Sequence, residues 1–116
     1  MPRSARRARL RSASDYEKVF EQGVRLQQGA FTAVFVCRQH GARLGFAISR
    51  KAVSLATQRN RLKRQARETF KRAMRASPGV DVVLLAKARA VALPNAVLRE
   101  TLERTWLRIQ KQCQES

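Results

Sequence analysis

The chain has 116 residues and carries 25 Lys and Arg against 8 Asp and Glu, a formal net charge of +17. This charge indicates a polyanionic partner, either a nucleic acid or an anionic membrane, and does not bear on the fold. The length and a hydrophobic fraction of 44% favour a single domain, residues 1–116, with a basic arm at 1–12. The Arg-rich start is not followed by an apolar export signal and no apolar run could span a bilayer, so we expect a cytoplasmic protein.

The first half of the chain predicts a helix followed by strands. Ser14 to Glu17 fits a capping box at the start of this helix, and Gly23 marks its end. Residues 31–38 are rich in β-branched and aromatic side chains, and residues 44–49 alternate large and small ones, so both segments are predicted strands. A further short strand would fit residues 24–28.

The second half predicts two helices separated by a buried strand. The first helix spans residues 58–75 and ends near the Ser-Pro-Gly sequence at 77–79. Residues 81–87 form the buried strand, and Pro94 and Asn95 open a last helix that repeats apolar residues from Leu98 to Ile109 at helical spacing. This order predicts an α+β fold, a small α/β sandwich with helices packed on a four-stranded sheet.

The helix at 58–75 separates apolar and cationic side chains onto opposite faces. Its apolar stripe comprises Leu62, Ala66, Phe70, Ala73 and Met74, and its cationic face comprises Lys63, Arg64, Arg67, Lys71 and Arg75. A helix built only for solubility would mix charges of both signs to gain i,i+4 ion pairs. The excess of Arg over Lys favours bidentate contacts with phosphates, and the apolar stripe is needed for the core, so this face predicts a structured nucleic acid rather than a membrane as partner.

Four aromatic residues form a second group of candidates, and each of them alone would fit a hydrophobic core: Tyr16, Phe20, Phe31 and Phe35. Together they would also suit a single-stranded nucleic acid, because bases stack on aromatic rings held at a sheet surface. Along the strand at 31–38, odd and even positions lie on opposite faces. Both faces are apolar, so the pattern leaves open which one is exposed.

Residues that could carry chemistry are sparse. Cys37 and Cys113 belong to no Cys-x-x-Cys or His/Cys cluster, so we expect two free thiols and no zinc site. His40 is alone in a predicted turn, and the carboxylates do not cluster as a two-metal nuclease requires. The sequence therefore predicts no catalytic residue and no metal site, and places the chemistry of any reaction in a partner.

Motifs along nearly the whole chain resemble the bacterial ribonuclease P protein component. The most specific is Arg-Asn-Arg-Leu-Lys-Arg at 59–64, preceded by Leu-Gly-Phe-Ala-Ile-Ser-Arg-Lys at 44–51 and followed by Arg67, Glu68 and Phe70. Further matches are Tyr-Glu-Lys-Val-Phe at 16–20, the strand at 81–87 and the last helix with Leu102 and Trp106. The resemblance implies a protein subunit that assists a catalytic RNA in removing the 5′ leader of precursor tRNA. It also implies a left-handed βαβ crossover.

The resemblance assigns two sets of binding residues and no tightly bound cofactor. Those expected to bind the catalytic RNA are Arg50, Lys51, Arg59, Asn60, Arg61, Lys63, Arg64 and Arg67. A cleft between the sheet and the first helix would hold the leader, lined by Tyr16, Phe20 and Phe31 with Val34 or Phe35. The expected partners are the catalytic RNA, which uses Mg²⁺, and precursor tRNA, without a membrane or an obligatory protein partner.

Three other functions fit parts of the sequence. A ribosomal or other structural RNA-binding protein would share the charge and the fold class but would play no part in cleavage. A nuclease with its own active site would need the acidic or histidine cluster that this sequence lacks. A DNA-binding helix-turn-helix would need a helix directly before the basic one, where strands are predicted instead.

Overall fold

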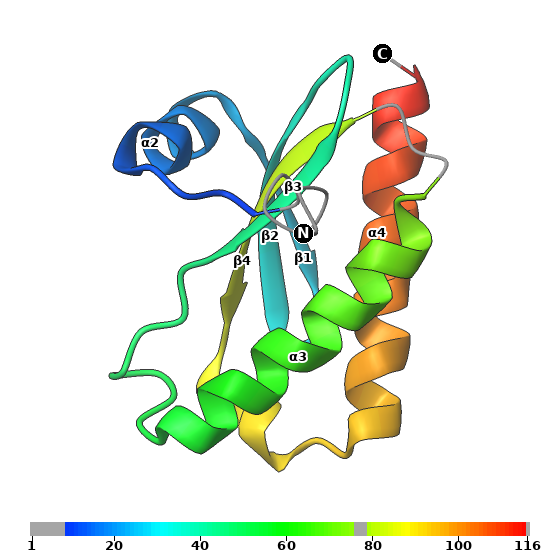
Figure 1. Cartoon of the computed structure of the whole chain (residues 1–116). Helices are drawn as coiled ribbons and strands as arrows, with labels where there is room; N and C mark the ends of the chain where they lie inside the picture. Colours follow the sequence, from blue (N-terminus) through cyan, green and yellow to red (C-terminus); the bar gives the residue numbers. More distant parts are fainter. Residues whose placement is uncertain (1–8, 76–78, 116) are drawn as a thin grey trace, which may run out of the picture.

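The computed structural model describes residues 9–75 and 79–115 and has the predicted α+β architecture (Figure 1). The elements follow in the order α2 (Ala13–Gln22), β1 (Val24–Gln28), β2 (Phe31–Cys37), β3 (Ala42–Phe46), α3 (Ala56–Ala73), β4 (Val80–Ala86), the 3-10 helix η1 (Ala88–Ala92) and α4 (Asn95–Glu115). The short strand at 24–28 is confirmed. Ser77 and Pro78 of the predicted stop signal, and most of the predicted basic arm, lie outside the described residues.

The N-cap of helix α2 lies two residues before the predicted one. Its N-cap is Ser12, whose Oγ accepts a hydrogen bond from the backbone N–H of Asp15 at 3.1 Å. The prediction of Ser14 as N-cap was wrong because Ser12 and Asp15 offer the same local capping geometry two residues earlier. Gly23 ends the helix as predicted, and its N–H bonds to the carbonyl of Val19 at 2.7 Å.

The four strands form one mixed sheet in the order β1-β2-β4-β3. Neighbours β1 and β2, and β2 and β4, are antiparallel, whereas β3 and β4 are parallel. Parallel neighbours need a long crossover, and α3 supplies it between β3 and β4. The register places Arg43 of β3 and Val36 of β2 on either side of Asp81 of β4.

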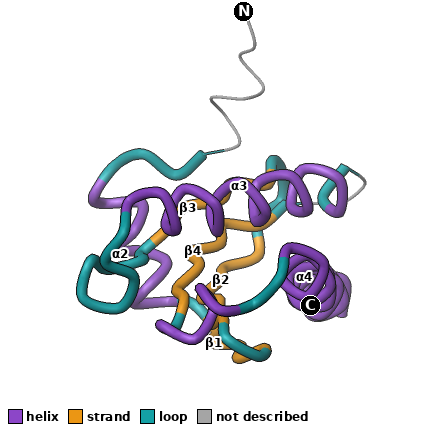
Figure 2. The backbone as a smooth tube through the Cα atoms, turned by 90° about the horizontal axis from the view of Figure 1, so that it is seen from below, coloured by secondary structure: helices purple, strands orange, loops and turns teal. Residues whose placement is uncertain are grey.

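Helices cover the two faces of the sheet unequally. Figure 2 shows α2 on the opposite side of the strands from α4, while α3 and α4 lie side by side. The larger core, between the sheet and α3 with α4, contains the fully buried rings of Phe31, Phe35 and Trp106. The smaller core, under α2, contains Leu10, Val19, Val34 and Val83. Odd positions of β2 therefore face α3 and α4, and Val34 faces α2.

Trp106 fixes the joint between the two long helices. Its ring meets Phe70 of α3 edge to face, with 5.0 Å between the ring centroids. Its indole Nε1–H donates to the hydroxyl of Thr69 at 2.8 Å, and both side chains are buried. Since a buried indole N–H without an acceptor would be costly, this bond specifies how α4 lies against α3.

The prediction of two free thiols is wrong, because Cys37 and Cys113 form a disulfide. It joins the last residue of β2 to the C-terminal part of α4, with Cα atoms 5.5 Å apart. The two residues are separated by 76 positions, and neither belongs to a spacing motif. Their proximity arises only from the packing of α4 along the sheet, which the sequence pattern does not show.

Because of this disulfide, we expect the free energy of unfolding to depend on whether the two cysteines are oxidised or reduced. Because the disulfide closes a long loop, reduction should lower the free energy of unfolding by about 2 to 4 kcal/mol. Urea unfolding with and without reductant measures the difference, and the double variant Cys37→Ser with Cys113→Ser should be insensitive to reductant. Equal unfolding midpoints for the oxidised and reduced wild type would contradict a stabilising disulfide.

Candidate nucleic-acid interface

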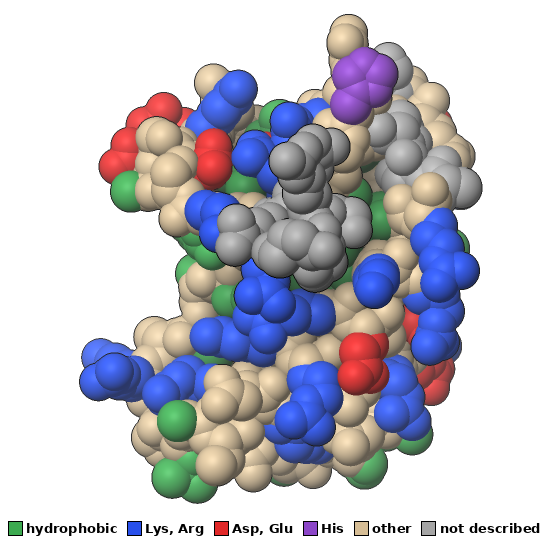
Figure 3. Space-filling view, viewed as in Figure 1, with side chains coloured by type: hydrophobic (Ala, Val, Ile, Leu, Met, Phe, Trp, Pro, Cys, Tyr) green, Lys and Arg blue, Asp and Glu red, His purple; other side chains and the backbone are tan. Residues whose placement is uncertain are grey.

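The outward face of α3 carries exposed polar and cationic side chains along the length of the helix. The exposed residues on it are Asn60, Arg64, Arg67, Glu68, Lys71 and Arg72, with Lys63 half-buried among them and Arg75 just beyond the helix. Figure 3 shows Lys and Arg side chains gathered over α3 and over the loop that precedes it. On the inward side Leu62, Ala66 and Phe70 are buried, so the core packing turns the cations toward solvent.

Phe46 at the end of β3 supports two of these cations. The guanidinium carbon of Arg67 lies 5.2 Å from the centre of the Phe46 ring, and the ammonium of Lys63 lies 5.9 Å from it. Partial burial lowers the pKa of Arg67, and repulsion from Arg9 lowers it further. Arg67 nevertheless stays charged at neutral pH, since arginine does not lose its proton in proteins. The ring therefore orients both cations by cation–π contacts.

The two arginines of the Arg-Asn-Arg sequence turn away from this face and bond within the protein. Arg61 donates from Nε to Asn95 Oδ1 at 2.9 Å, from Nη1 to Gln58 Oε1 at 3.2 Å, and from Nη2 to the carbonyl of Leu93. Arg59 donates from Nη1 to the carbonyls of Val53 and Ser54, at 2.8 and 2.9 Å. Each arginine thus holds a segment that adjoins α3, a structural role that the sequence did not predict.

Arg50 and Lys51 extend the cationic surface beyond the start of α3. Both are exposed on the loop between β3 and α3, which projects at the lower left of Figure 1. Ser49 fixes the turn that carries them, because its Oγ accepts from the N–H of Ala52 at 3.0 Å and its carbonyl accepts from the N–H of Val53 at 2.9 Å. The hydrogen bonds of Ser49 therefore hold the turn from which Arg50 and Lys51 project into solvent.

The five predicted leader-binding residues are divided between the two faces of the sheet. Tyr16 and Phe20 belong to α2; the Tyr16 hydroxyl accepts from the N–H of Phe46 at 3.2 Å, and Phe20 is 39% exposed. Val34 is buried beneath α2. Phe31 and Phe35 are 0% and 2% exposed in the core against α3 and α4. These two phenylalanines cannot line a surface with Tyr16 and Phe20, so their assignment to the cleft was wrong.

The surface beside α2 instead includes three small or aliphatic side chains that sequence reasoning missed. Thr32 and Leu85 are cross-strand neighbours, Ala47 follows β3, and all three are half-buried. Thr32 lies two positions from Val34 on the same sheet face, at the end that α2 leaves open. Figure 3 shows a hollow at the left, between the lobe formed by α2 and the lobe formed by the loop after β3.

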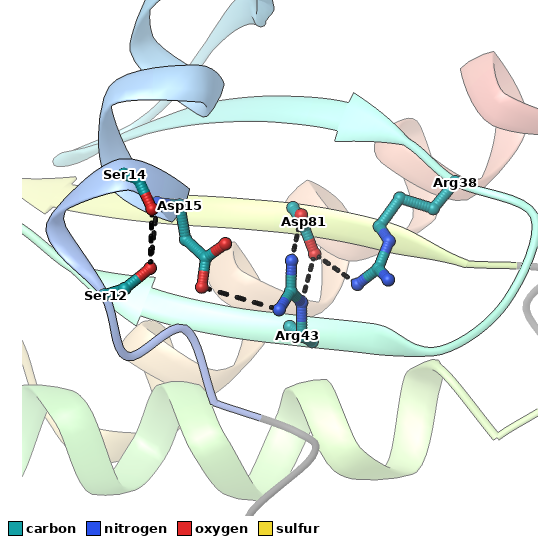
Figure 4. A network of polar contacts seen from close by, with 6 residues as sticks. All are labelled: Ser12, Ser14, Asp15, Arg38, Arg43 and Asp81. Atoms are coloured by element: carbon teal, nitrogen blue, oxygen red, sulfur yellow. Dashed lines mark hydrogen bonds and ion pairs between the residues drawn. The ribbon is translucent and has the colours of Figure 1, made fainter.

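A glycine and an ion-pair network fix α2 against this face. A Cβ atom on Gly45 would lie 2.5 Å from the Tyr16 hydroxyl, so only glycine permits this approach of α2 to β3. Buried Asp81 accepts from Arg38 at 3.0 Å and from Arg43 at 2.8 and 2.7 Å (Figure 4). Arg43 also lies 3.5 Å from the carboxylate of Asp15 on α2. The network thereby joins two strands to the first turn of α2.

The network also shifts the ionisation of its members. Hydrogen bonding to Asp81 raises the pKa of Arg43 despite its partial burial. The pKa of Asp15 is lowered, first by its hydrogen bond with the Ser12 side chain and also by the charge of Arg43. The contribution of Asp15 to stability is thus present at neutral pH and is lost as the pH falls through its lowered pKa. Asp15 and Asp81 are far apart in sequence and meet at Arg43, which the parallel register of β3 and β4 places beside Asp81.

Metal-binding clusters and membrane spans are both absent from the described residues. Within residues 9–75 and 79–115, no group of three or more His, Cys, Asp or Glu side chains is placed to hold a metal ion. In that same part of the chain, none of the helices has the length and apolar character needed to cross a membrane.

Known proteins similar to this chain share one family. A family model described as Ribonuclease P matches residues 4–110. The chain is 38% identical over 109 residues to the ribonuclease P protein component of Nitrosococcus oceani, covering 93% of this chain and 92% of that protein. It superposes on the RNase P protein of Staphylococcus aureus with a TM-score of 0.78 at 25% identity, covering 90% and 95% of the two chains. For that of Thermotoga maritima the TM-score is 0.74 at 32% identity, with 86% and 96% covered.

The internal bonds of Arg61 predict that it serves stability, whereas exposed Arg64 does not. Arg61→Ala should lower the free energy of unfolding by about 1.5 kcal/mol or more. The backbone carbonyls of Val91 and Leu93 and the side-chain amides of Gln58 and Asn95 would be left without their charged donor. Arg64→Ala, a matched substitution on the same helix, should change it by less than about 0.5 kcal/mol. Urea unfolding compares the two variants, and equal effects would refute the structural role of Arg61.

Proposed function

The chain belongs to the bacterial ribonuclease P protein family and is the protein subunit of that endoribonuclease, and from this premise we propose which surface meets which RNA. The catalytic RNA binds the outward face of α3 together with the loop that carries Arg50 and Lys51. The single-stranded 5′ leader of precursor tRNA binds the hollow beside α2. The two RNAs thereby approach the protein on adjoining surfaces.

The observation that carries this proposal is the charge separation across α3. One side of the helix is buried in the core, while the exposed side presents Asn60, Arg64, Arg67 and Lys71 with Glu68 as its acidic neighbour. Like charges held at this density repel one another in the free protein, and a polyphosphate backbone relieves the repulsion. Fixed cations also displace the counterions that RNA would otherwise retain, which favours binding at moderate salt.

The leader site is supported by exposure and by shape. Phe20 offers a partly exposed ring on α2, the helix that forms one side of the hollow, and unstacked bases gain about 1 to 3 kcal/mol each on such a platform. The half-buried side chains on the sheet face beside α2 carry no formal charge, so this surface suits bases and sugars; they are Thr32, Ala47 and Leu85. The cations of α3 and of the loop then lie beside the path of the leader phosphates.

In this proposal the protein contributes binding and screening, and the catalytic RNA contributes the chemistry. Hydrolysis of a phosphodiester by this holoenzyme would use Mg²⁺ held by the RNA. Cations of the protein placed between two RNAs reduce their mutual repulsion, so less Mg²⁺ is needed to bring substrate and catalyst together. The protein thus raises substrate affinity without supplying a catalytic residue.

A cleavage assay at low Mg²⁺ tests this assignment. Precursor tRNA is incubated with the protein alone, with a bacterial ribonuclease P RNA alone, and with both. We expect rapid removal of the 5′ leader only with both. Cleavage by the protein alone would identify a nuclease with its own active site, and the absence of rescue by a matched RNA would leave a structural RNA-binding protein.

Substitutions on the two surfaces should have separable effects. Arg64→Ala with Arg67→Ala should weaken binding of the catalytic RNA and flatten its salt dependence, by roughly 0.7 to 0.9 in the log–log slope for each phosphate that the protein no longer neutralises. Phe20→Ala should weaken binding of a leader-bearing precursor by about tenfold, within the range expected for the removal of one base stack, and leave mature tRNA unaffected.

An exposed apolar residue on a helix outside both proposed surfaces serves as the control. Leu107 of α4 is 63% exposed and apolar, like Phe20, so Leu107→Ala should change neither measurement. The proposal of two surfaces would fail if the arginine variants and Phe20→Ala altered binding of the catalytic RNA and of the leader to the same degree.

A further inference from the structure

The Arg-Asn-Arg sequence sends its two guanidinium groups to different neighbours of α3. Residues two apart on an α-helix point about 200° from each other, so Arg59 and Arg61 lie on opposite sides of the helix. Arg61 reaches Leu93, between η1 and α4, and Asn95, the first residue of α4. Arg59 reaches back to the loop between β3 and α3, through Val53 and Ser54. Asn60 lies between them and is exposed.

The loop held by Arg59 is attached at two further points. Val53 is only 2% exposed and packs in the larger core, which anchors the end of the loop next to α3. Ser49 closes the turn from the other end by bonding the N–H groups of Ala52 and Val53. Arg50 and Lys51 project from the turn between these anchors and are exposed.

We propose that Arg59 is a positioning residue, which aligns Arg50 and Lys51 with the cationic face of α3 and contributes to RNA binding through that loop rather than by its own phosphate contact. The proposal rests on the function proposed above, since it takes the catalytic RNA as the ligand of both cationic segments. It assigns Arg59 a role different from that of Arg64, although both are arginines of the same helix.

The physical basis is the entropy of the loop. Cations on a mobile loop must be ordered when RNA binds, and each ordered backbone and side chain subtracts from the binding free energy. Arg59 offsets part of this cost in the free protein, because its Nη1 joins two consecutive carbonyls of the loop to a rigid helix. Two phosphate-binding groups then meet the RNA already spaced for it.

A double-mutant cycle distinguishes the two roles. Binding of a bacterial ribonuclease P RNA is measured for four full-length proteins: wild type, Arg59→Ala, Arg50→Ala with Lys51→Ala, and the triple variant. If Arg59 acts through the loop, Arg59→Ala should weaken binding by about tenfold in the wild type but by less than about twofold once Arg50 and Lys51 are gone. An equal loss in both backgrounds would overturn the proposal and indicate a direct phosphate contact.

A second variant loosens the same loop without removing a charge. Ser49→Ala deletes the hydroxyl that caps the turn, leaving every cation in place. We expect it to weaken RNA binding in the wild type, by a smaller factor than Arg59→Ala, and to have no effect without Arg50 and Lys51. If Arg59→Ala does not fold, the Ser49→Ala variant tests the proposal in its place. An unchanged RNA affinity of folded Ser49→Ala would overturn the proposal.

Arg61→Ala supplies the control for general loss of stability. Arg61 bonds to Gln58 of α3 and to Val91, Leu93 and Asn95 around the start of α4, rather than to the loop that carries Arg50 and Lys51. Whatever Arg61→Ala costs in RNA affinity should therefore be the same with and without Arg50 and Lys51. If the effect of Arg61→Ala on RNA affinity depended on Arg50 and Lys51 as strongly as that of Arg59→Ala, the loop-specific role of Arg59 would be overturned. If the wild-type protein did not bind the RNA at all, the proposed function itself would be overturned. If it bound, and the effects of the Arg59 and Arg50/Lys51 substitutions were additive, only the positioning role of Arg59 would be overturned.

Discussion

The packing of α3 onto the sheet is the constraint on which both binding surfaces depend. Leu62, Ala66 and Phe70 are buried against the strands and α4, and this fixes the rotation of the helix about its axis. Once that rotation is set, Arg64, Arg67 and Lys71, which lie opposite the buried stripe, are exposed to solvent. Trp106 of α4 holds α3 in the same rotation through its contacts with Phe70 and Thr69. A chain with this excess of positive charge can fold because one stripe of α3 is free of charge.

The cations of the protein divide into those that hold the structure and those that remain available to RNA. Arg38 and Arg43 pair with buried Asp81, and Arg59 and Arg61 bond to backbone carbonyls of neighbouring segments. Net charge alone therefore overstates the binding surface. The guanidinium group suits both tasks, since its planar array of donors satisfies carbonyls and carboxylates as readily as phosphates. Position relative to the core, rather than residue type, decides which task an arginine performs.

Several features of the fold and the site could be predicted from the sequence because they depend on local periodicity. The apolar stripe of α3, the existence and order of the strands and the start of α4 at Asn95 all follow from patterns within a few residues, and the structure confirms them. The strand predicted at 44–49 lies two to three residues earlier, at Ala42–Phe46. Two of the predictions that failed concern choices between equivalent local options. Ser12 and Ser14 could each cap α2, and the two faces of β2 are both apolar, so only burial under the helices distinguished Phe35 from Val34.

The sequence by itself determined the class of fold, the existence of a cationic helix and, through its motifs, the family. Helical and strand periods act over short distances, and charge is a property of composition, so neither requires knowledge of distant contacts. Tertiary structure alone decided the Cys37–Cys113 disulfide, the Asp15–Arg43–Asp81 network and the bonds of Arg61 to Leu93 and Asn95. Each of these joins separate segments of the chain, and no local pattern encodes which segments meet when a sheet and two long helices pack.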